Sequence, residues 1–212
     1  MNWITKIIKA GEKIKTAIRE RATKADIAKS DWTSCCRGPI LKKDLEANLW
    51  VCPDCNKHHY ISPTNRFNLM FGKDGWKKIE SPQPPPDPYK WEDTKKYVDR
   101  LKDAKKITGQ DNAILSCEAK INNIDVVVSA VDFKFIGGSI SMAEGENVLA
   151  AVQIAINKKC PYIFVSASGG MRMMTNILSL MQMTRMTVGI NALREKNLPY
   201  IVVATSPTTG GL

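Results

Sequence analysis

Three pairs of adjacent glycines are the residues of this sequence whose type and spacing most favour a chemical role. Each pair follows an apolar, β-branched stretch, and the pairs are Gly137-Gly138, Gly169-Gly170 and Gly210-Gly211. A strand that ends in two glycines can present bare backbone N–H groups to a ligand oxygen, because no Cβ blocks the approach. Paired N–H donors stabilise a developing enolate or oxyanion. Ordinary turn glycines are the alternative interpretation of any single pair.

Four cysteines form a second candidate site in the first third of the chain. They are Cys35, Cys36, Cys52 and Cys55, of which the last two make a C-x-x-C pair. Without secretory features, such pairs favour zinc over disulfides, because a thiolate tetrahedron stabilises a segment that has almost no core. The adjacent cysteines cannot form the usual knuckle, in which two residues separate the ligands. A degraded zinc site, or one that uses His58 or His59, therefore stays open as an alternative.

The rest of the chain offers few groups for acid–base or nucleophilic chemistry. His58 and His59 are its only histidines, and it has no G-x-S-x-G elbow or Walker phosphate loop. Asp132, Glu144 and Glu146 are candidate acids or bases, but the two glutamates flank a helix start, where stabilising the helix N-terminus is the commoner role. We therefore expect an enzyme here to rely on backbone amides, with the base supplied by substrate or cofactor. Cys117 and Cys160 are expected to be small core residues.

Alternating strands and helices in the second half of the chain predict an α/β fold with buried, apolar strands. The predicted strands are Ala113–Lys120, Asp125–Val131, Tyr162–Ser166 and Tyr200–Thr205, and the predicted helices are Met142–Asn157 and Thr175–Lys196. The first two strands read as a hairpin with a turn at Asn122-Asn123. Upstream, Tyr89–Lys106 has helical character, and the proline-rich Ser81–Pro88 indicates an extended crossing.

Composition sets the broad class of protein. The chain has 212 residues, 43% of them hydrophobic and 25% charged, which suits one full soluble domain and a small second one. It has no apolar run near the roughly 20 residues of a membrane span, and its N-terminus lacks the apolar core of a signal peptide. We therefore expect a cytoplasmic protein with no membrane span.

The net charge of +10 is concentrated at the N-terminus. Residues 1–30 carry eight Lys or Arg against three Asp or Glu, and their isoleucines fall near helical spacing. This pattern predicts a basic amphipathic helix. A solvated helix docked on protein, a membrane-surface contact and a nucleic-acid contact are all compatible with it.

These features divide the chain into four parts. We expect a basic arm over residues 1–30, a zinc ribbon over 31–64, a connecting region over 65–110 and an α/β portion over 111–212. A Gly-Gly turn after a buried strand should lead into a further element, and the sequence stops at Leu212. We therefore expect a fragment, or half of a domain that another chain completes.

The motifs in this order resemble the β subunit of the bacterial acetyl-CoA carboxylase carboxyltransferase. They are WTSC, LKKDLEANLWVCPDCNKHH, FKFIGGSIS, SASGGMRM with LSLMQM, and LPYIVVATSPTTGG, from about Trp32 to Leu212. The resemblance implies a zinc ribbon followed by a crotonase-like ββα superhelical domain, incomplete here. It also implies an α2β2 enzyme with an α subunit, which moves a carboxyl group from carboxybiotin on the biotin carboxyl carrier protein to acetyl-CoA and yields malonyl-CoA.

The same resemblance implies roles for particular residues. Gly210 and Gly211 match the family's oxyanion pair, whereas Gly137-Gly138 and Gly169-Gly170 match loops that line its acyl-CoA cleft. Cys36, Cys52 and Cys55 match ribbon ligands, and Cys35 is the thiol available as the fourth. Met171, Met174-Thr175 and Ser206 stand where the family usually has Ala, Gln-Glu and Asp.

The implied mechanism needs no histidine, because the biotin nitrogen freed by loss of CO2 can take the α-proton of acetyl-CoA. Two alternatives stay open from the sequence. One is a related carboxyltransferase that acts on another acyl-CoA, with an acyl pocket altered by its methionines. The other is a nucleic-acid-binding module built from the basic arm and ribbon, with the α/β part as a scaffold.

Overall fold

The computed structural model describes residues 32–35 and 38–209 in two compact units, which meet in sequence between Ile61 and Ser62. Each unit is described by itself. The basic helix expected over residues 1–30 lies outside the described residues, and so do Cys36, Gly210 and Gly211.

The first unit is a small hairpin structure with a cysteine-rich core. Strand β1 (Trp32–Cys35) pairs antiparallel with β2 (Gly38–Leu41), and the short helix α3 (Lys42–Ala47) follows. The chain then turns back at an isolated antiparallel bridge between Val51 and His58. The buried core consists of Cys35, Ile40, Leu45 and Cys52. A core of this size gives little stability of its own.

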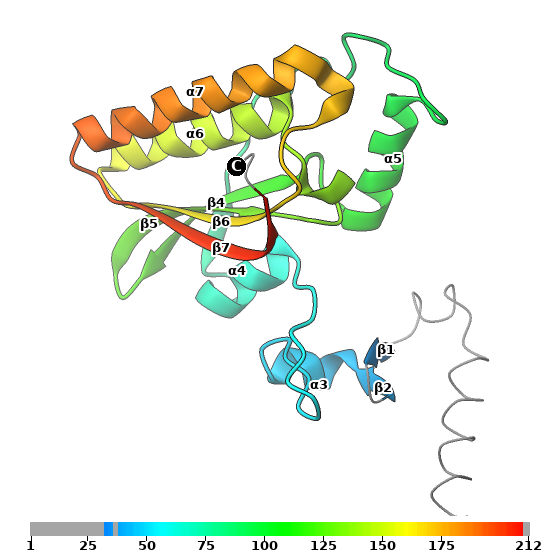
Figure 1. The fold of residues 1–212 in the computed structure, drawn as a ribbon. Helices are drawn as coiled ribbons and strands as arrows, with labels where there is room; N and C mark the ends of the chain where they lie inside the picture. The colour runs from blue at the N-terminus through cyan, green and yellow to red at the C-terminus, as the bar shows by residue number, and fades with distance from the viewer. Residues whose placement is uncertain (1–31, 36–37, 210–212) are drawn as a thin grey trace, which may run out of the picture. The chain divides into compact units, whose positions relative to one another are not determined.

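The second unit is built on a five-stranded mixed sheet, with its strands in the order β3-β4-β5-β6-β7 (Figure 1). The strands are β3 (Trp76–Lys78), β4 (Ile114–Ile121), β5 (Ile124–Val131), β6 (Tyr162–Ser168) and β7 (Tyr200–Thr208). The first three run antiparallel, whereas β5, β6 and β7 are mutually parallel. The helices are α4 (Pro63–Phe71), α5 (Tyr97–Thr108), α6 (Met142–Lys158) and α7 (Asn176–Glu195). This arrangement confirms the α/β fold.

The alternation of side chains along the strands separates two apolar layers. Val127 and Val131 of β5 belong to the core that α6 covers, whereas Val126, Val128 and Ala130 face a second core that includes Phe67 of α4. Figure 1 shows α6 and α7 on one face of the sheet and α4 on the other. Burial on both faces explains why β4, β5 and β6 are almost continuously apolar. The expectation of a buried strand is wrong for β7, whose residues are exposed except for the half-buried Thr205, because β7 is an edge strand that neither apolar core reaches.

The predicted elements from residue 113 onward are confirmed, with ends that differ by at most three residues. Asn122 and Asn123 both have positive φ, at 49° and 66°, which is the geometry of the predicted tight hairpin turn. Helix α5 begins only at Tyr97, because residues 89–96 form turns held by the Asp87 side chain and a bridge from Glu92 to Lys96.

Two elements of the second unit were not predicted from the sequence. Helix α4 begins with Ser62 as N-cap, whose Oγ accepts the Asn65 N–H at 3.2 Å, and with Pro63 in the first turn. Ser-Pro at a helix start is a signal that could have located it. Strand β3 has only three residues and forms by pairing with β4. No local sequence pattern predicts this pairing.

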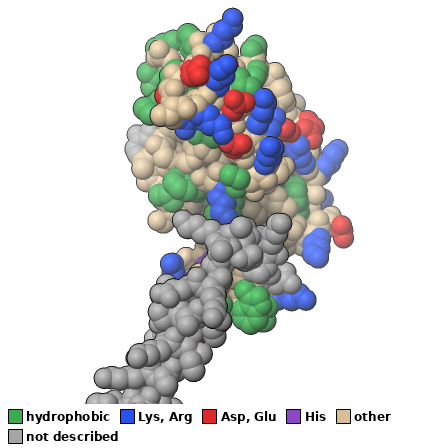
Figure 2. Space-filling model, turned by 90° about the vertical axis from the view of Figure 1, so that its right-hand side faces the viewer, with side chains coloured by type: hydrophobic (Ala, Val, Ile, Leu, Met, Phe, Trp, Pro, Cys, Tyr) green, Lys and Arg blue, Asp and Glu red, His purple; other side chains and the backbone are tan. Residues whose placement is uncertain are grey.

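No helix among the described residues is long and apolar enough to cross a membrane. Figure 2 shows basic and acidic side chains interspersed on the face that includes α5. The ion pairs around this helix are Lys95–Asp103, Arg100–Asp93, Lys102–Asp99 and Lys105–Asp111. These four basic side chains are therefore matched by nearby carboxylates.

Phe67 should contribute strongly to the stability of the second unit. It is fully buried, with its ring 5.3 Å from that of Trp76 in an edge-on contact. Phe67→Ala should lower the free energy of unfolding by about 3–5 kcal/mol, measured by urea unfolding. Leu69→Ala on the same helix is the control, because Leu69 is 45% exposed. Equal losses in the two variants would contradict the assigned packing.

Candidate functional site

The candidate site lies where the parallel strands end. Gly137-Gly138 follow β5 and Gly169-Gly170 follow β6, and β7 leads to Thr209, which precedes the third pair in sequence. Because these strands are parallel neighbours, their carboxyl ends lie at one edge of the sheet. The fold therefore brings together the Gly137-Gly138 loop, the Gly169-Gly170 loop about 30 residues further on, and Thr209 about 40 residues beyond that.

Backbone hydrogen bonds join the first two glycine loops directly. The Gly169 N–H donates to the Gly137 carbonyl at 2.9 Å, and the Ile140 N–H donates to the Gly170 carbonyl at 2.9 Å. The Arg172 N–H donates to the Ile140 carbonyl at 2.8 Å. The two loops therefore form a short parallel bridge between Ile140 and Met171. The two loops thus behave as one structural element.

Gly138 must be glycine for both conformational and steric reasons. Its φ is +63°, and a Cβ built on it would lie 2.2 Å from the Ala167 carbonyl oxygen. A side chain would therefore separate this loop from the end of β6. The close approach of bare backbone is the physical reason for a glycine here.

Three of the glycine N–H groups already have partners within the chain. Gly138 donates to the Phe135 carbonyl, Gly169 to the Gly137 carbonyl and Gly170 to the Ser168 hydroxyl. The expectation that each glycine pair presents bare N–H groups is therefore wrong for these three amides, since they hold the loops together. The sequence could not reveal this, because the partners depend on how the strand ends pack.

A buried guanidinium connects these loops to two helices. Arg172 is 3% exposed, and its Nη2 donates to Glu144 Oε1 at 2.6 Å and also to the Ser139 carbonyl. Its Nη1 donates to the Tyr97 hydroxyl of α5 at 2.9 Å. Burial alone would lower the pKa of Arg172, but Glu144 and Tyr97 beside it raise that pKa above its usual value. The group therefore stays charged.

Glu144 stabilises the start of α6, which was its commoner expected role. Its Oε2 accepts the Ser141 N–H at 2.9 Å in a capping box, and its Oε1 accepts the Ala113 N–H at 2.9 Å. Glu146 is paired with Arg185 at 2.6 Å, and Asp132 accepts the Lys134 N–H at 2.8 Å. All three candidate carboxylates thus have structural partners in the described part of the chain.

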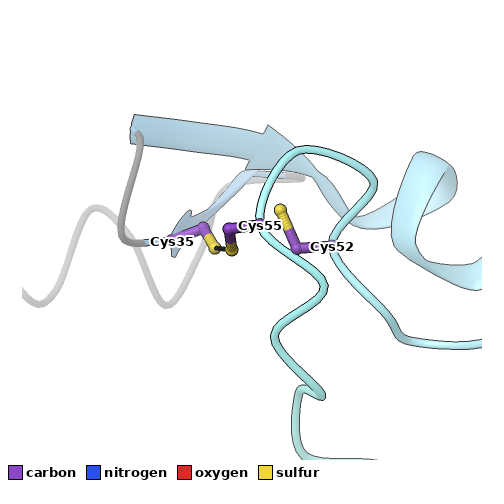
Figure 3. A group of neighbouring side chains, drawn as sticks. All are labelled: Cys35, Cys52 and Cys55. Carbon is purple, nitrogen blue, oxygen red and sulfur yellow. Dashed lines mark hydrogen bonds between the residues drawn. The ribbon is translucent and has the colours of Figure 1, made fainter.

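The cysteine site gathers three thiols in the first unit. The Sγ atoms of Cys35, Cys52 and Cys55 all lie within 4.8 Å of one another, and the Cys35 and Cys55 sulfurs are 3.4 Å apart. Figure 3 shows Cys35 at the end of β1 beside Cys55, with Cys52 on the same loop as Cys55. Tetrahedral zinc with Zn–S bonds of about 2.3 Å needs sulfurs about 3.8 Å apart. The three thiols therefore fit such an ion.

The remaining candidates for this site take different positions. His58 and His59 do not join the described group of possible ligands, and the His59 Nε2 is buried without a partner in that part of the chain. Cys117 and Cys160 are buried in the second unit, as expected for core residues. Burial raises the pKa of the Cys117 thiol to about 12, so this sulfur stays protonated.

Arg172 and Ser168 were not singled out in the sequence, although both are buried at the glycine loops. Their signal is positional, since each lies within three residues of Gly169-Gly170 at the end of an apolar strand. A polar residue there indicates a partner nearby, but only the folded chain identifies it.

Comparisons with known proteins agree on the class of this chain. Residues 97–212 match the model of the carboxyl transferase domain. Over its whole length, the chain is 55% identical to the acetyl-coenzyme A carboxylase carboxyl transferase subunit beta of Pelagibacter ubique, and it covers 69% of that protein. It is 41% identical to the same subunit of Beijerinckia indica and covers 72% of it.

A solved structure supports the fold independently. Transcarboxylase 12S, in a crystal structure with methylmalonyl-coenzyme A and methylmalonic acid bound, superposes with a TM-score of 0.53 and 20% identity. The match covers 71% of this chain and 26% of that one. It confirms the crotonase-like carboxyltransferase fold that the resemblance implied. Neither relative is named as a nucleic-acid-binding protein, so that alternative gains no support.

Two alanine variants can separate the steric cost of a side chain at Gly138 from the cost of its positive φ. Gly109 has a similar φ of +71°, and no heavy atom lies within 4 Å of the position that a Cβ would take there. Gly109→Ala should lower the free energy of unfolding by about 1–2 kcal/mol, the cost of the left-handed backbone. Gly138→Ala should cost at least about 3 kcal/mol, because overpacking adds to that cost. Equal values in denaturant unfolding would contradict the close approach.

Proposed function

This chain belongs to the family of acetyl-coenzyme A carboxylase carboxyl transferase beta subunits, and we propose that it transfers a carboxyl group to acetyl-CoA to give malonyl-CoA. The observation that carries this proposal within the molecule is the convergence of the β5, β6 and β7 ends at one edge of the sheet, with the two described glycine loops and Thr209. Backbone sites of this kind suit acyl-CoA chemistry that passes through an enolate.

The proposed roles follow the positions of the glycine pairs. Gly210 and Gly211 hold the enolate oxygen with their N–H groups. Gly137-Gly138 and Gly169-Gly170 line the acyl-CoA site, and their joined loops keep its wall in place. Carboxybiotin on the biotin carboxyl carrier protein supplies the carboxyl group and the base. Proton transfer by this chain is not required, which agrees with the structural partners of Asp132, Glu144 and Glu146.

A second subunit is part of the proposal. We assign the carboxyltransferase alpha subunit as the partner, in an α2β2 assembly that presents carboxybiotin to the acyl-CoA. Helix α7 supports a partner surface, because it buries the polar Ser179 and Gln182 while large apolar side chains are about half exposed. These side chains are Ile177, Leu180, Met181 and Val188. Exposed apolar groups of this kind commonly mark protein contacts.

We also propose that the first unit holds a structural zinc ion through Cys35, Cys36, Cys52 and Cys55. The three described thiols support this, because they lie at distances that suit tetrahedral zinc, and two of them belong to the four-residue core of this unit. When bound, the ion links β1 to the turn that carries Cys52 and Cys55. Its role is to stabilise this unit, and the carboxyl transfer does not pass through it.

Zinc binding can be tested by elemental analysis of the purified protein. We expect about one zinc per chain, and Cys52→Ser should remove most of it, because the three thiols that remain hold zinc more weakly than four. Cys160→Ser is the control, since Cys160 is buried in the second unit and its loss should leave the zinc content unchanged. A wild-type chain with well under half an equivalent of zinc would overturn the site.

The oxyanion assignment can be tested at Gly211 with a pair of variants. Gly211→Pro deletes the N–H donor, and turnover of the complex with the alpha subunit should fall about 100-fold or more, the scale of one lost oxyanion donor. Gly211→Ala keeps the donor and adds only a methyl group, so it measures the steric effect alone. Folding is followed by circular dichroism in parallel. A stable Gly211→Pro protein with full turnover would exclude the role.

A further inference from the structure

The Ser168 side chain lies between the first two glycine pairs and bonds to both. Its Oγ donates to the Gly138 carbonyl at 2.7 Å and accepts the Gly170 N–H at 3.0 Å. One hydroxyl therefore acts as donor towards the loop after β5 and as acceptor towards the loop after β6. A hydroxyl can do both at once, because it has one O–H and two lone pairs.

The backbone of the same residue reaches the third loop. The Ser168 carbonyl accepts the Thr209 N–H at 3.0 Å and the Thr209 Oγ1 at 3.1 Å. Thr209 immediately precedes Gly210 in the sequence. Ser168 thus contacts both described glycine pairs and the residue next to the third pair.

Ser168 and the two residues that its hydroxyl bonds to are buried. Ser168 itself is fully buried, and a Cβ built on Gly138 would lie 3.2 Å from the Ser168 Cα. Without the hydroxyl, the Gly138 carbonyl and the Gly170 N–H would each lose a hydrogen bond. A buried polar group without a partner costs about 1–3 kcal/mol, which favours a shift of the loops.

We propose that Ser168 is a positioning residue for carboxyl transfer, which holds the Gly137-Gly138 loop, the Gly169-Gly170 loop and Thr209 in a fixed spatial relation. This inference rests on the proposed function. The two described pairs line the acyl-CoA site and Gly210-Gly211 hold the enolate oxygen, so the thioester meets its donors only if all three loops keep their spacing. Ser168 touches none of the reacting atoms and acts through the backbone that it orients.

The experiment compares Ser168→Ala with Ser129→Ala in the complex with the alpha subunit. Ser129 is a suitable control, because it is also a fully buried strand serine with two hydroxyl partners, Ser116 at 2.6 Å and Tyr162 at 2.9 Å. Neither of these partners belongs to a glycine loop. We expect Ser168→Ala to lower kcat by about 100-fold, the scale of a misplacement near 1 Å, with a much smaller change in KM. Ser129→Ala should lower stability but leave kcat near wild type.

Two further measurements keep the inference falsifiable. Ser168→Cys should recover part of kcat, because the thiol occupies the same place as a weaker donor and acceptor. Amide hydrogen exchange should show faster exchange at Gly169 and Gly170 in Ser168→Ala than in Ser129→Ala. Wild-type kcat in Ser168→Ala, or equal kcat losses in the two alanine variants, would overturn the positioning role. A wild-type complex without carboxyl transfer would overturn the proposed function instead, and the exchange rates would still decide whether Ser168 orders the loops.

Discussion

The buried ion pair between Arg172 and Glu144 is the interaction on which the organisation of the second unit depends. An isolated charge could not be buried at this depth, so each group requires the other and a full set of hydrogen bonds. Those bonds reach the loop after β5 through Ser139, the hairpin start through Ala113 and helix α5 through Tyr97. Segments that lie far apart in sequence are thereby held in one geometry. The first two glycine pairs lie beside this network in the sequence, because Ser139 follows Gly138 and Arg172 lies two residues after Gly170.

Backbone groups take two different parts at the sheet edge. The amides of Gly138, Gly169 and Gly170 form contacts within and between the loops, and the absence of a Cβ at Gly138 lets the loops touch. Gly138 is therefore needed first for close packing. The proposed function assigns the oxyanion to the pair after β7, which leaves the first two pairs to shape the acyl-CoA site. This division of roles suits the proposed reaction, in which carboxybiotin supplies both the carboxyl group and the base.

The first unit follows a different physical logic. Its core contains two cysteines among four buried residues, so its thiols must serve as packing groups and as the proposed ligands. Segments with so little apolar burial usually need a covalent or metal crosslink to fold. The second unit needs no such help, since apolar layers on both faces of the sheet bury β4, β5 and β6.

Most elements of the second unit, and the residue types of both candidate sites, could be predicted from local patterns in the chain. Periodicity located the strands and helices from residue 113 onward, Asn122-Asn123 marked the hairpin and the cysteine spacing indicated a metal site. Each of these features depends on residues a few positions apart. The short strand β3, the partners of the glycine amides, and the roles of Arg172 and Ser168 emerged only in the folded chain. They depend on which strand ends lie side by side, and a buried polar residue has no identifiable partner until the chain has folded around it.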